Sequence, residues 1–312
     1  MFVTAGLSSG SVRKLYAVMF VLLTGCGRIG FEPFGIAGGD DGGVADGIDA
    51  PTSCTAFGPW GTPRRITELA TTADEYGVQI MADGLTLYFD RHGTVADELF
   101  VARRPDRSSP FGVAQALPEL GMGNSEGSAT ARGDELEIYF ESSRSGTVCI
   151  YRATRSGDVS TWGTPVAVTT LCGSATEGPF LTHDGLTLYY STASPPTDSG
   201  TIMVSQRAST AAGFPTGTPI VELMSGATKG YPVASSDGLT VYFESGSPTD
   251  LFEATRPTLG SAFGAATQIQ GINTASIEQD VSISADGLEL FFGSDRLVSG
   301  DLDLYVATRT CI

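Results

Sequence analysis

The sequence predicts an all-β fold, a five-bladed β-propeller in which each blade is a four-stranded sheet. A short alternating segment occurs five times, and the aligned leucines of its copies are 51, 50, 53 and 49 residues apart. This spacing is the length of one propeller blade. Two further elements, a run that ends in arginine and a run opened by an aromatic residue, also recur five times. Three elements repeated in a constant order predict five equivalent modules.

The alternating segment predicts the second strand of each blade. It reads ADGLTLYF at 82–89 and returns as GDELEIYF at 133–140, HDGLTLYY at 183–190, SDGLTVYF at 236–243 and ADGLELFF at 285–292. An Asp-Gly pair between two alternating apolar runs is typical of a hairpin with a type I′ turn. The first strand of each blade therefore ends just before this pair. In the second module, Asp134 and Glu135 take the place of Asp-Gly.

The arginine-ended runs predict the third strand of each blade, and the aromatic residues open the fourth. The arginines are Arg104, Arg155, Arg207, Arg256 and Arg309, and the aromatic residues are Trp60, Phe111, Trp162, Phe214 and Phe263. The first aromatic run has no module before it, and the last arginine run has no aromatic run after it. We therefore expect the strand within 60–69 to complete the fifth blade beside the C-terminal strand, which leaves no exposed sheet edge. Residues that recur in every blade are interpreted as scaffold.

The cysteines predict two disulfides. When the ends of the chain are aligned on the second module, Cys54 and Cys311 fall on neighbouring positions of one hairpin loop. A bond between them would replace the covalent link that the closing blade lacks. Cys149 on the third strand and Cys172 at the end of the fourth strand of the second blade are expected to bridge that hairpin. Such bonds persist in oxidising compartments.

The N-terminus predicts a lipoprotein of the cell envelope. Arg13 and Lys14 precede an apolar run at 15–23 that is too short to span a membrane and is typical of a signal peptide. The following Leu-Thr-Gly-Cys resembles a bacterial lipobox, so we expect residues 1–25 to be removed and Cys26 to be lipidated. Residues 26–56 then form a Gly/Asp-rich linker, and residues 57–312 form the propeller. Because Gly27 and not aspartate follows the cysteine, we expect a lipid anchor in the outer membrane, facing the periplasm or the surface.

The charge balance excludes nucleic acid as a partner. The chain has 35 Asp and Glu against 18 Lys and Arg, so its field repels phosphate backbones. Only two histidines, His92 and His183, are present, and they are far apart in the sequence. This leaves little material for a histidine-ligated metal or a catalytic triad.

The repeats resemble the WD40-like β-propeller repeat of the TolB type, in which a polar strand is followed by DG, a strand such as LTLYF, and a strand such as DLYVATR. The resemblance covers about 57–312 and rests on five copies that agree in order and spacing. It implies a propeller in a cell-envelope protein that acts in binding or assembly. The blade count of five differs from that of TolB itself, so the partners of TolB are not carried over.

Positions near the start of the first strand predict a ligand site, because propellers line their axial channel with this strand. They are Glu75, Glu126, Glu177, Lys229 and Glu278, with Asp280 nearby. In one interpretation these glutamates are structural and accept hydrogen bonds from neighbouring backbone N–H groups or contact the next blade. In the other, they form a site at the channel mouth for a cation or for a polar ligand such as a sugar. Calcium suits a cluster of oxygen ligands, and no other cofactor is expected.

We expect a monomeric, non-catalytic binding module for an envelope protein or a glycan, since propellers present a rigid face with variable loops. The alternative is a propeller glycoside hydrolase, which needs two carboxylates of which one has a raised pKa. Its candidates are Glu75, Glu126, Glu177 and Glu278, but their repetition and the short loops argue against an enzyme. A sialidase is a weaker alternative, because the segment 156–162 resembles an Asp-box that is one residue short and occurs once.

Overall fold

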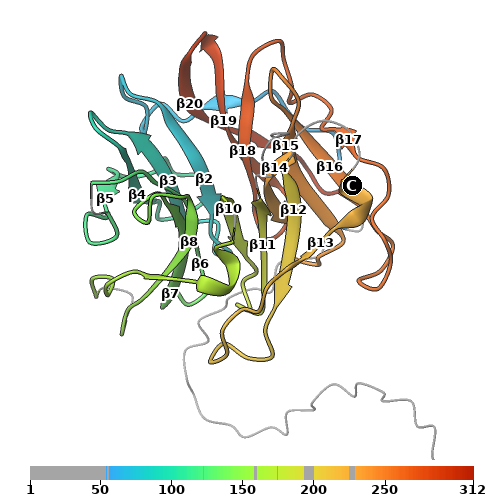
Figure 1. The fold of residues 1–312 in the computed structure, drawn as a ribbon. Helices are drawn as coiled ribbons and strands as arrows, with labels where there is room; N and C mark the ends of the chain where they lie inside the picture. Colours follow the sequence, from blue (N-terminus) through green and yellow to red (C-terminus); the bar gives the residue numbers. More distant parts are fainter. Residues whose placement is uncertain are drawn as a thin grey trace, which may run out of the picture. The chain divides into compact units, whose positions relative to one another are not determined.

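The computed structural model describes residues 54, 56–121, 123–157, 160–173, 175–192, 200–224 and 229–312. In this part of the chain, five four-stranded antiparallel sheets are arranged as the blades of a propeller (Figure 1). The predicted five-bladed all-β fold is confirmed. The expected signal peptide, Cys26 and nearly all of the expected linker lie outside the described residues. No helix of the described residues is long and apolar enough to cross a membrane.

The blades are numbered here in chain order, and the strands of each blade from the axis outward. Blade one consists of β2 (Glu75–Ile80), β3 (Thr86–His92), β4 (Asp97–Arg103) and β5 (Gln115–Ala116). Blade two consists of β6 (Glu126–Ala131), β7 (Glu137–Ser142), β8 (Cys149–Thr154) and β9 (Val166–Ala167). Blade three consists of β10 (Thr176–Leu181), β11 (Thr187–Thr192), β12 (Thr201–Gln206) and β13 (Thr218–Pro219). Blade four consists of β14 (Lys229–Ala234), β15 (Thr240–Ser245), β16 (Asp250–Thr255) and β17 (Thr267–Gln268). Blade five consists of β18 (Glu278–Ile283), β19 (Glu289–Val298), β20 (Asp301–Thr308) and β1 (Arg64–Arg65). Two 3-10 helices, η1 (Thr169–Leu171) and η2 (Val221–Leu223), follow β9 and β13.

The second strand of each blade is buried on both faces, because every blade of the ring packs between two others. In β3 the consecutive side chains of Leu87, Tyr88 and Phe89 are all 1% exposed or less. This explains why the repeat carries adjacent apolar residues where a half-exposed strand would alternate strictly. The first strands of neighbouring blades contact one another, which places them around the axis.

The Asp-Gly turns differ from the predicted type I′ hairpin. A type I′ turn needs a positive φ at both central residues, whereas only the glycine has one, as Gly84 does at 67°. The N–H of Gly84 donates to the carbonyl of Met81 (2.9 Å), and the Asp83 carboxylate accepts from the N–H of Leu85 (2.7 Å). The aspartate side chain therefore closes a longer turn with a single left-handed residue. In blade two, Glu135 takes that conformation at φ 52°.

The N-terminal strand completes blade five, as predicted. Arg64 and Arg65 of β1 pair with Val306 and Tyr305 of β20 in antiparallel register. Because β1 comes from the start of the described chain and β20 from its end, this pairing closes the ring by hydrogen bonds between the two ends.

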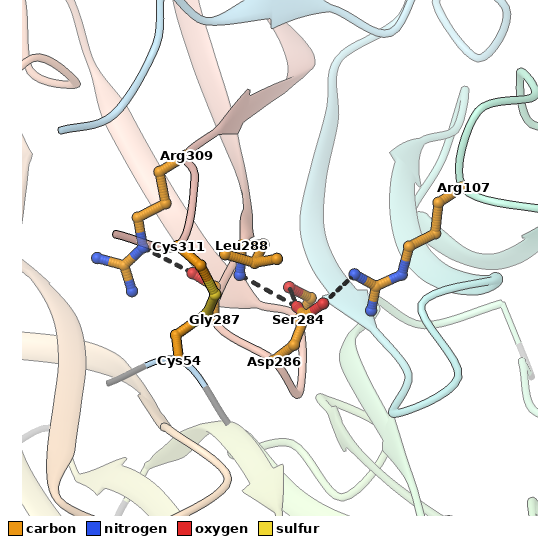
Figure 2. The surroundings of a disulfide bond; sticks show 8 residues. All are labelled: Cys54, Arg107, Ser284, Asp286, Gly287, Leu288, Arg309 and Cys311. Atoms are coloured by element: carbon orange, nitrogen blue, oxygen red, sulfur yellow. Dashed lines mark hydrogen bonds and ion pairs between the residues drawn. A yellow bond between two sulfur atoms is a disulfide. The ribbon is translucent and has the colours of Figure 1, made fainter. Parts of the chain in front are cut away.

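The Cys54–Cys311 disulfide reinforces this closure (Figure 2). The two Cα atoms are 5.3 Å apart, and 257 positions separate the two residues in the sequence. Beside the bond, the Arg309 side chain donates to the carbonyl of Gly287 (2.7 Å), which ties the last strand to the turn of its own blade. The predicted bond is confirmed.

The second predicted disulfide, Cys149–Cys172, is also present and links β8 to the end of η1 within blade two. Two disulfides in one folded chain are typical of oxidising compartments. The folded part of the chain therefore belongs to a periplasmic or extracellular protein.

The arginine at the end of each third strand ties its blade together. Arg207, for example, donates to the carbonyl of Gly185 (2.6 Å), and its guanidinium lies 4.5 Å from the ring centre of Phe214. The same pair of contacts recurs at Arg104, Arg155, Arg256 and Arg309. One arginine thus connects the turn between the first two strands to the aromatic residue before the fourth strand, which accounts for the recurrence of these elements.

Candidate active site

A β-bulge interrupts the first strand of every blade at the same place. In each blade the register with the second strand shifts between the second and fifth residues of the first strand. The third residue of the strand has a positive φ in all five blades: Gly77, Ser128, Gly178, Tyr231 and Asp280, at 50° to 60°. Three of these are not glycine, and such residues are uncommon in this conformation. Backbone strain of this kind clusters at functional sites.

The bulge directs backbone N–H groups to carboxylates of the preceding blade. Ser128 donates to Asp90 (2.8 Å), Gly178 donates to Glu141 (2.7 Å), and Asp280 donates to Glu244 (3.2 Å). The three acceptors occupy the same position of β3, β7 and β15, one residue beyond the recurrent aromatic residue. The equivalent residues of the other two blades are Ser191 and Gly293.

Burial raises the pKa of these axial carboxyl groups. It raises the pKa of Glu141 to about 8, with further contributions from the negative charges of Glu177, Asp280 and Asp97. Burial, together with neighbouring carboxylates, also raises the pKa of Asp90 and of Glu244 well above the usual range. Glu141 and Glu244 are half-buried, so each also has surface that solvent can reach.

Asp280 adds a fourth carboxyl group from the bulge itself. Burial raises its pKa, whereas hydrogen bonds from the Gly77 N–H and the Gln279 side chain oppose the rise. The Gln279 amide nitrogen lies 2.9 Å from the Asp280 carboxylate. Asp280 was predicted as a site residue, and the structure places it at the axial cavity with the other left-handed residues.

The pKa of Asp97, at the start of β4, is shifted in the opposite direction. Burial acts to raise its pKa, but hydrogen bonds from Tyr76, His92 and Ser125 outweigh this effect and hold the pKa below the usual value. The Nδ1 atom of His92 lies 2.7 Å from the carboxylate, and this contact raises the pKa of His92 in turn. The negative charge of Asp97 contributes to the raised pKa of Glu141. Near neutral pH these shifts favour the protonated form of Glu141 and the ionised form of Asp97.

The glutamates predicted to line the channel are mostly held by arginines. Glu75 is fully buried and pairs with Arg91 at 2.8 Å, and Glu278 is fully buried and pairs with Arg296 at 3.0 Å. Glu126 is paired with Arg144 at 3.0 Å in the same way. These arginines also donate to backbone carbonyls of the segment that precedes the first strand, at Leu69, Leu120 and Ile272. In these three blades the structural interpretation of the glutamates applies.

Glu177 does not occupy the position of the other three glutamates. In blade three it is Thr176, paired with Thr192, that corresponds to Glu75 and Glu126, and Glu177 pairs with Ser191 one residue later. Successive strand residues face opposite sides, so Glu177 is turned toward the axial carboxylates and adds to the raised pKa of Glu141 and Glu244. Burial raises its own pKa. Lys229 begins β14, and its side chain lies outside the described atoms.

The axial cavity itself is narrow. It measures about 20 Å³ and is lined by the bulge residues together with neighbours such as Pro179 and Pro232. That is room for about one water molecule, so a sugar does not enter the axis and has to lie across its mouth. Among the described residues, no three His, Cys, Asp or Glu side chains are arranged to hold a metal ion. Calcium at this mouth stays a prediction.

Four carboxyl groups of the site were not predicted from the sequence: Asp90, Glu141, Glu244 and Asp97. The first three directly follow the YF or equivalent of the second strand, where the five repeats read Asp, Glu, Ser, Glu and Gly. A polar position that varies among otherwise repeated modules was therefore visible in the sequence. Its orientation toward the axis was not, because it depends on the bulge in the strand beside it.

Comparisons with known proteins support the fold. No family model matches the sequence, and no curated sequence is similar to it. Among solved structures, the catalytic domain of a GH62 α-L-arabinofuranosidase from Coprinopsis cinerea matches with a TM-score of 0.53 and 11% identity, over 83% of this chain and 98% of that one. A Podospora anserina α-L-arabinofuranosidase in complex with cellotriose matches with a TM-score of 0.52 and 10% identity, over 83% and 98% of the two chains. TolB from Acinetobacter baumannii matches with a TM-score of 0.49 and 14% identity, over 73% of this chain. The match spans about half of that TolB, 53% of its length.

These matches correct the expectation of a non-catalytic protein. Propellers that superpose on most of this chain are glycoside-cleaving enzymes, so neither the ring nor its repetition argues against catalysis. The carboxylates visible as candidates in the sequence were the repeated glutamates. The structure adds a second set, on the second strands, that is not repeated in all blades.

Proposed function

We propose that the protein is a propeller glycoside hydrolase that binds a carbohydrate across the axial mouth. The observation that carries the proposal is that two carboxyl groups have opposite pKa shifts: the pKa of Glu141 is raised to about 8, and that of Asp97 is lowered. Glycoside hydrolysis needs one carboxylic acid to protonate the leaving oxygen and one carboxylate to act as base or nucleophile. Two carboxyl groups whose surroundings shift their pKa values apart are the expected signature of these roles.

Glu141 is the proposed general acid. Because burial raises its pKa, it is protonated at neutral pH, and the residue as a whole is half-buried. The Gly178 N–H binds one of its oxygens at 2.7 Å, and the other oxygen is the proposed proton donor.

Asp97 is the proposed base or nucleophile. Tyr76, His92 and Ser125 stabilise its ionised form and orient it. The negative charge of Asp97 itself favours the positive charge that develops on the sugar ring in the transition state. The fold of the arabinofuranosidases is consistent with this assignment, and a pentose or hexose glycoside is the expected substrate class.

Turnover of chromogenic glycosides tests the proposal. We expect the purified protein to release 4-nitrophenol from at least one member of a panel that includes the α-L-arabinofuranoside and the β-xyloside. Glu141→Gln and Asp97→Asn should each lower kcat/KM by about 10²- to 10⁴-fold. Glu98→Gln is the matched control, because Glu98 is exposed beside Asp97 and lies outside the site.

Equal turnover by the wild type and Glu141→Gln would contradict the role of Glu141. Binding to a glycan array without turnover of any glycoside would contradict catalysis and leave a carbohydrate-binding protein. Capture of one envelope protein, with neither binding nor turnover of sugars, would favour a protein partner instead.

We also propose that the chain is a monomeric lipoprotein of the TolB-type repeat class, anchored in the outer membrane through Cys26. The lipobox-like sequence at 23–26 and the two disulfides support an envelope location. Mass spectrometry of the protein purified from membranes should show a diacylated Cys26 as the first residue. A soluble Cys26→Ala variant is the expected consequence of losing the anchor.

A further inference from the structure

The junctions between neighbouring blades contain a recurrent ion pair. In two of the five junctions, a glutamate that begins the second strand of one blade binds the arginine that ends the third strand of the next blade. Glu137 of blade two binds Arg207 of blade three at 2.6 Å, and Glu289 of blade five binds Arg104 of blade one at 2.6 Å. Both arginines are nearly inaccessible to solvent.

In the junction between blades two and three, a tyrosine joins the ion pair. Arg207 and Tyr139, which together bind the carboxylate, are called the cradle below. The Tyr139 hydroxyl donates to the Glu137 carboxylate at 3.0 Å and accepts from Arg207 at 3.2 Å. A carboxylate in this position therefore accepts hydrogen bonds from a guanidinium and from a phenol hydroxyl, and the bond from the guanidinium is strengthened by its charge.

The junction between blades three and four has the same donors but no carboxylate. Thr187 begins β11 at the position of Glu137, Tyr189 corresponds to Tyr139, and Arg256 corresponds to Arg207. Arg256 donates to the carbonyl of Gly238 (2.9 Å) and hydrogen-bonds to Tyr189. Among the described residues, no carboxylate forms an ion pair with Arg256.

A pocket of about 700 Å³ opens at this junction. Its lining includes Arg256, Tyr189 and Thr187 from the cradle, and the apolar side chains of Phe180, Ile220 and Leu259. A volume of this size is in the range of small-molecule sites, which typically combine apolar walls with a few convergent polar groups.

At the two remaining junctions, the second strand of the first blade also begins with threonine, at Thr86 and Thr240, but a glutamate from another position lies near the arginine. Between blades one and two, Glu135 binds both Arg103 (2.6 Å) and Arg155 (2.7 Å). Between blades four and five, Glu253 lies close enough to Arg309 for the arginine to oppose the rise in its pKa that burial causes. Among the described residues, Arg256 is therefore the junction arginine that neither forms an ion pair nor lowers the pKa of a carboxyl group.

We propose that the pocket between blades three and four binds a monocarboxylate ligand with an apolar body, whose carboxylate takes the place that Glu137 occupies in the neighbouring junction. Arg256 and Tyr189 bind the carboxylate, and Phe180 and its apolar neighbours contact the body of the ligand. This site is separate from the axial mouth and does not depend on its chemistry.

Acidic residues at the rim set a limit on the ligand. Asp184 and Asp237 line the same pocket, but each is committed to its own turn through the N–H of Leu186 (2.9 Å) or Leu239 (2.9 Å). Their charges, with that of exposed Glu222, oppose a second negative charge on the ligand. A dicarboxylate or a phosphate ester is therefore expected to bind more weakly than a monocarboxylate.

Calorimetric titration of the purified protein tests the site, with 3-phenylpropionate and the peptide Ala-Ala-Phe as probes. Their neutral partners, 3-phenylpropanamide and the C-terminally amidated peptide, have the same apolar bodies. We expect at least one of the acids to bind at least tenfold more tightly than its amide. Tighter binding of the free acid alone would identify a small-molecule site, and tighter binding of the peptide would identify recognition of a C-terminus. Equal affinity of acid and amide in both pairs would overturn the proposal.

Two variants locate the binding in the pocket. Arg256→Gln should weaken binding of the acid at least tenfold. Because Arg256 also supports its own blade, a second variant avoids that contact: Thr187→Glu rebuilds the neighbouring cradle with an internal carboxylate. We expect Thr187→Glu to abolish binding and to raise the melting temperature.

Thr240→Glu is the matched control, since it makes the same change at the junction between blades four and five, where Glu253 is already present. It should leave binding unchanged. Wild-type affinity in Thr187→Glu, or equal loss in Thr240→Glu, would overturn the assignment.

Discussion

Glu137 shows how a single charged residue is made compatible with the interior of the ring. Arg207, Arg132, Arg152 and Tyr139 all contact its carboxylate. Burial acts to raise the pKa of Glu137, but the hydrogen bonds from Arg207 and Arg152 outweigh it and lower the pKa. The ionised form is therefore the one that the fold retains.

Removing the buried partner of Glu137 should cost far more than removing the exposed one. The side chain of Arg207 is 1% exposed and that of Arg152 is 44% exposed. Breaking a buried ion pair typically costs about 3–5 kcal/mol, because a charge remains uncompensated, whereas a partner that is exposed to water is screened and its loss costs less. We expect urea denaturation to show this order for Arg207→Gln and Arg152→Gln. Equal losses would contradict the greater cost of removing the buried arginine.

Individual site residues were only partly predictable from the sequence. The arginines Arg104 and Arg207 recur visibly, but their partners Glu289 and Glu137 lie in other blades, far away in the chain. Asp280 was identified because it lies near the start of a first strand. Glu177 was aligned with the wrong position, because a one-residue offset in an irregular segment changes the face on which a side chain lies.

At the level of elements, the strands were predictable and their irregularities were not. The LTLYF-type segments form the buried second strands, since apolar content and turn residues dictate a strand between two turns. The bulges of the five first strands have no residue type in common that would reveal them in the sequence. Gly, Ser, Tyr and Asp all occur at the left-handed position of β2, β6, β10, β14 and β18. Their effect is to point N–H groups at Asp90, Glu141 and Glu244, which creates the axial site.

The two disulfides should differ in their contribution to stability. Cys54–Cys311 links residues 257 positions apart, and Cys149–Cys172 links residues 23 positions apart. On the chain-entropy argument the longer loop contributes roughly 5 kcal/mol and the shorter roughly 3 kcal/mol. We expect the Cys54→Ser, Cys311→Ser pair of substitutions to lower the free energy of unfolding more than the Cys149→Ser, Cys172→Ser pair. The opposite order in denaturant titrations would show that β1 pairing alone secures the ring.

For the whole molecule, the sequence predicted the number of blades and the closure, because five repeats with a displaced fourth strand permit one ring. It did not predict the chemistry. The chemistry that we propose lies where the repeats differ: in the carboxylates at the axis, and in the junction of blades three and four. A fold of near-identical modules thus shows its sites as departures from the repeat.

The axial carboxyl groups should make the whole protein less stable as pH rises toward 8. Burial raises their pKa in the folded state, so between about 4.5 and 8 the folded protein retains protons that the unfolded chain releases. The contribution of Glu141 is full below its ordinary pKa and is lost as pH rises through its folded value. Each pKa unit corresponds to about 1.4 kcal/mol. We expect the melting temperature to fall from pH 5 to pH 8, and to fall less in Glu141→Gln, whereas Glu98→Gln should follow the wild type. A profile of Glu141→Gln parallel to the wild type would contradict this origin.

The proposed function depends most on Glu141 and Asp97 being held in opposite protonation states. Their carboxyl ¹³C chemical shifts, followed by NMR as a function of pH in protein labelled at Glu and Asp side chains and assigned through Glu141→Gln and Asp97→Asn, measure this directly. We predict that Glu141 titrates with a midpoint near 8 and that Asp97 titrates below its usual range. A midpoint for Glu141 near 4.5, the ordinary value for glutamate, would contradict it.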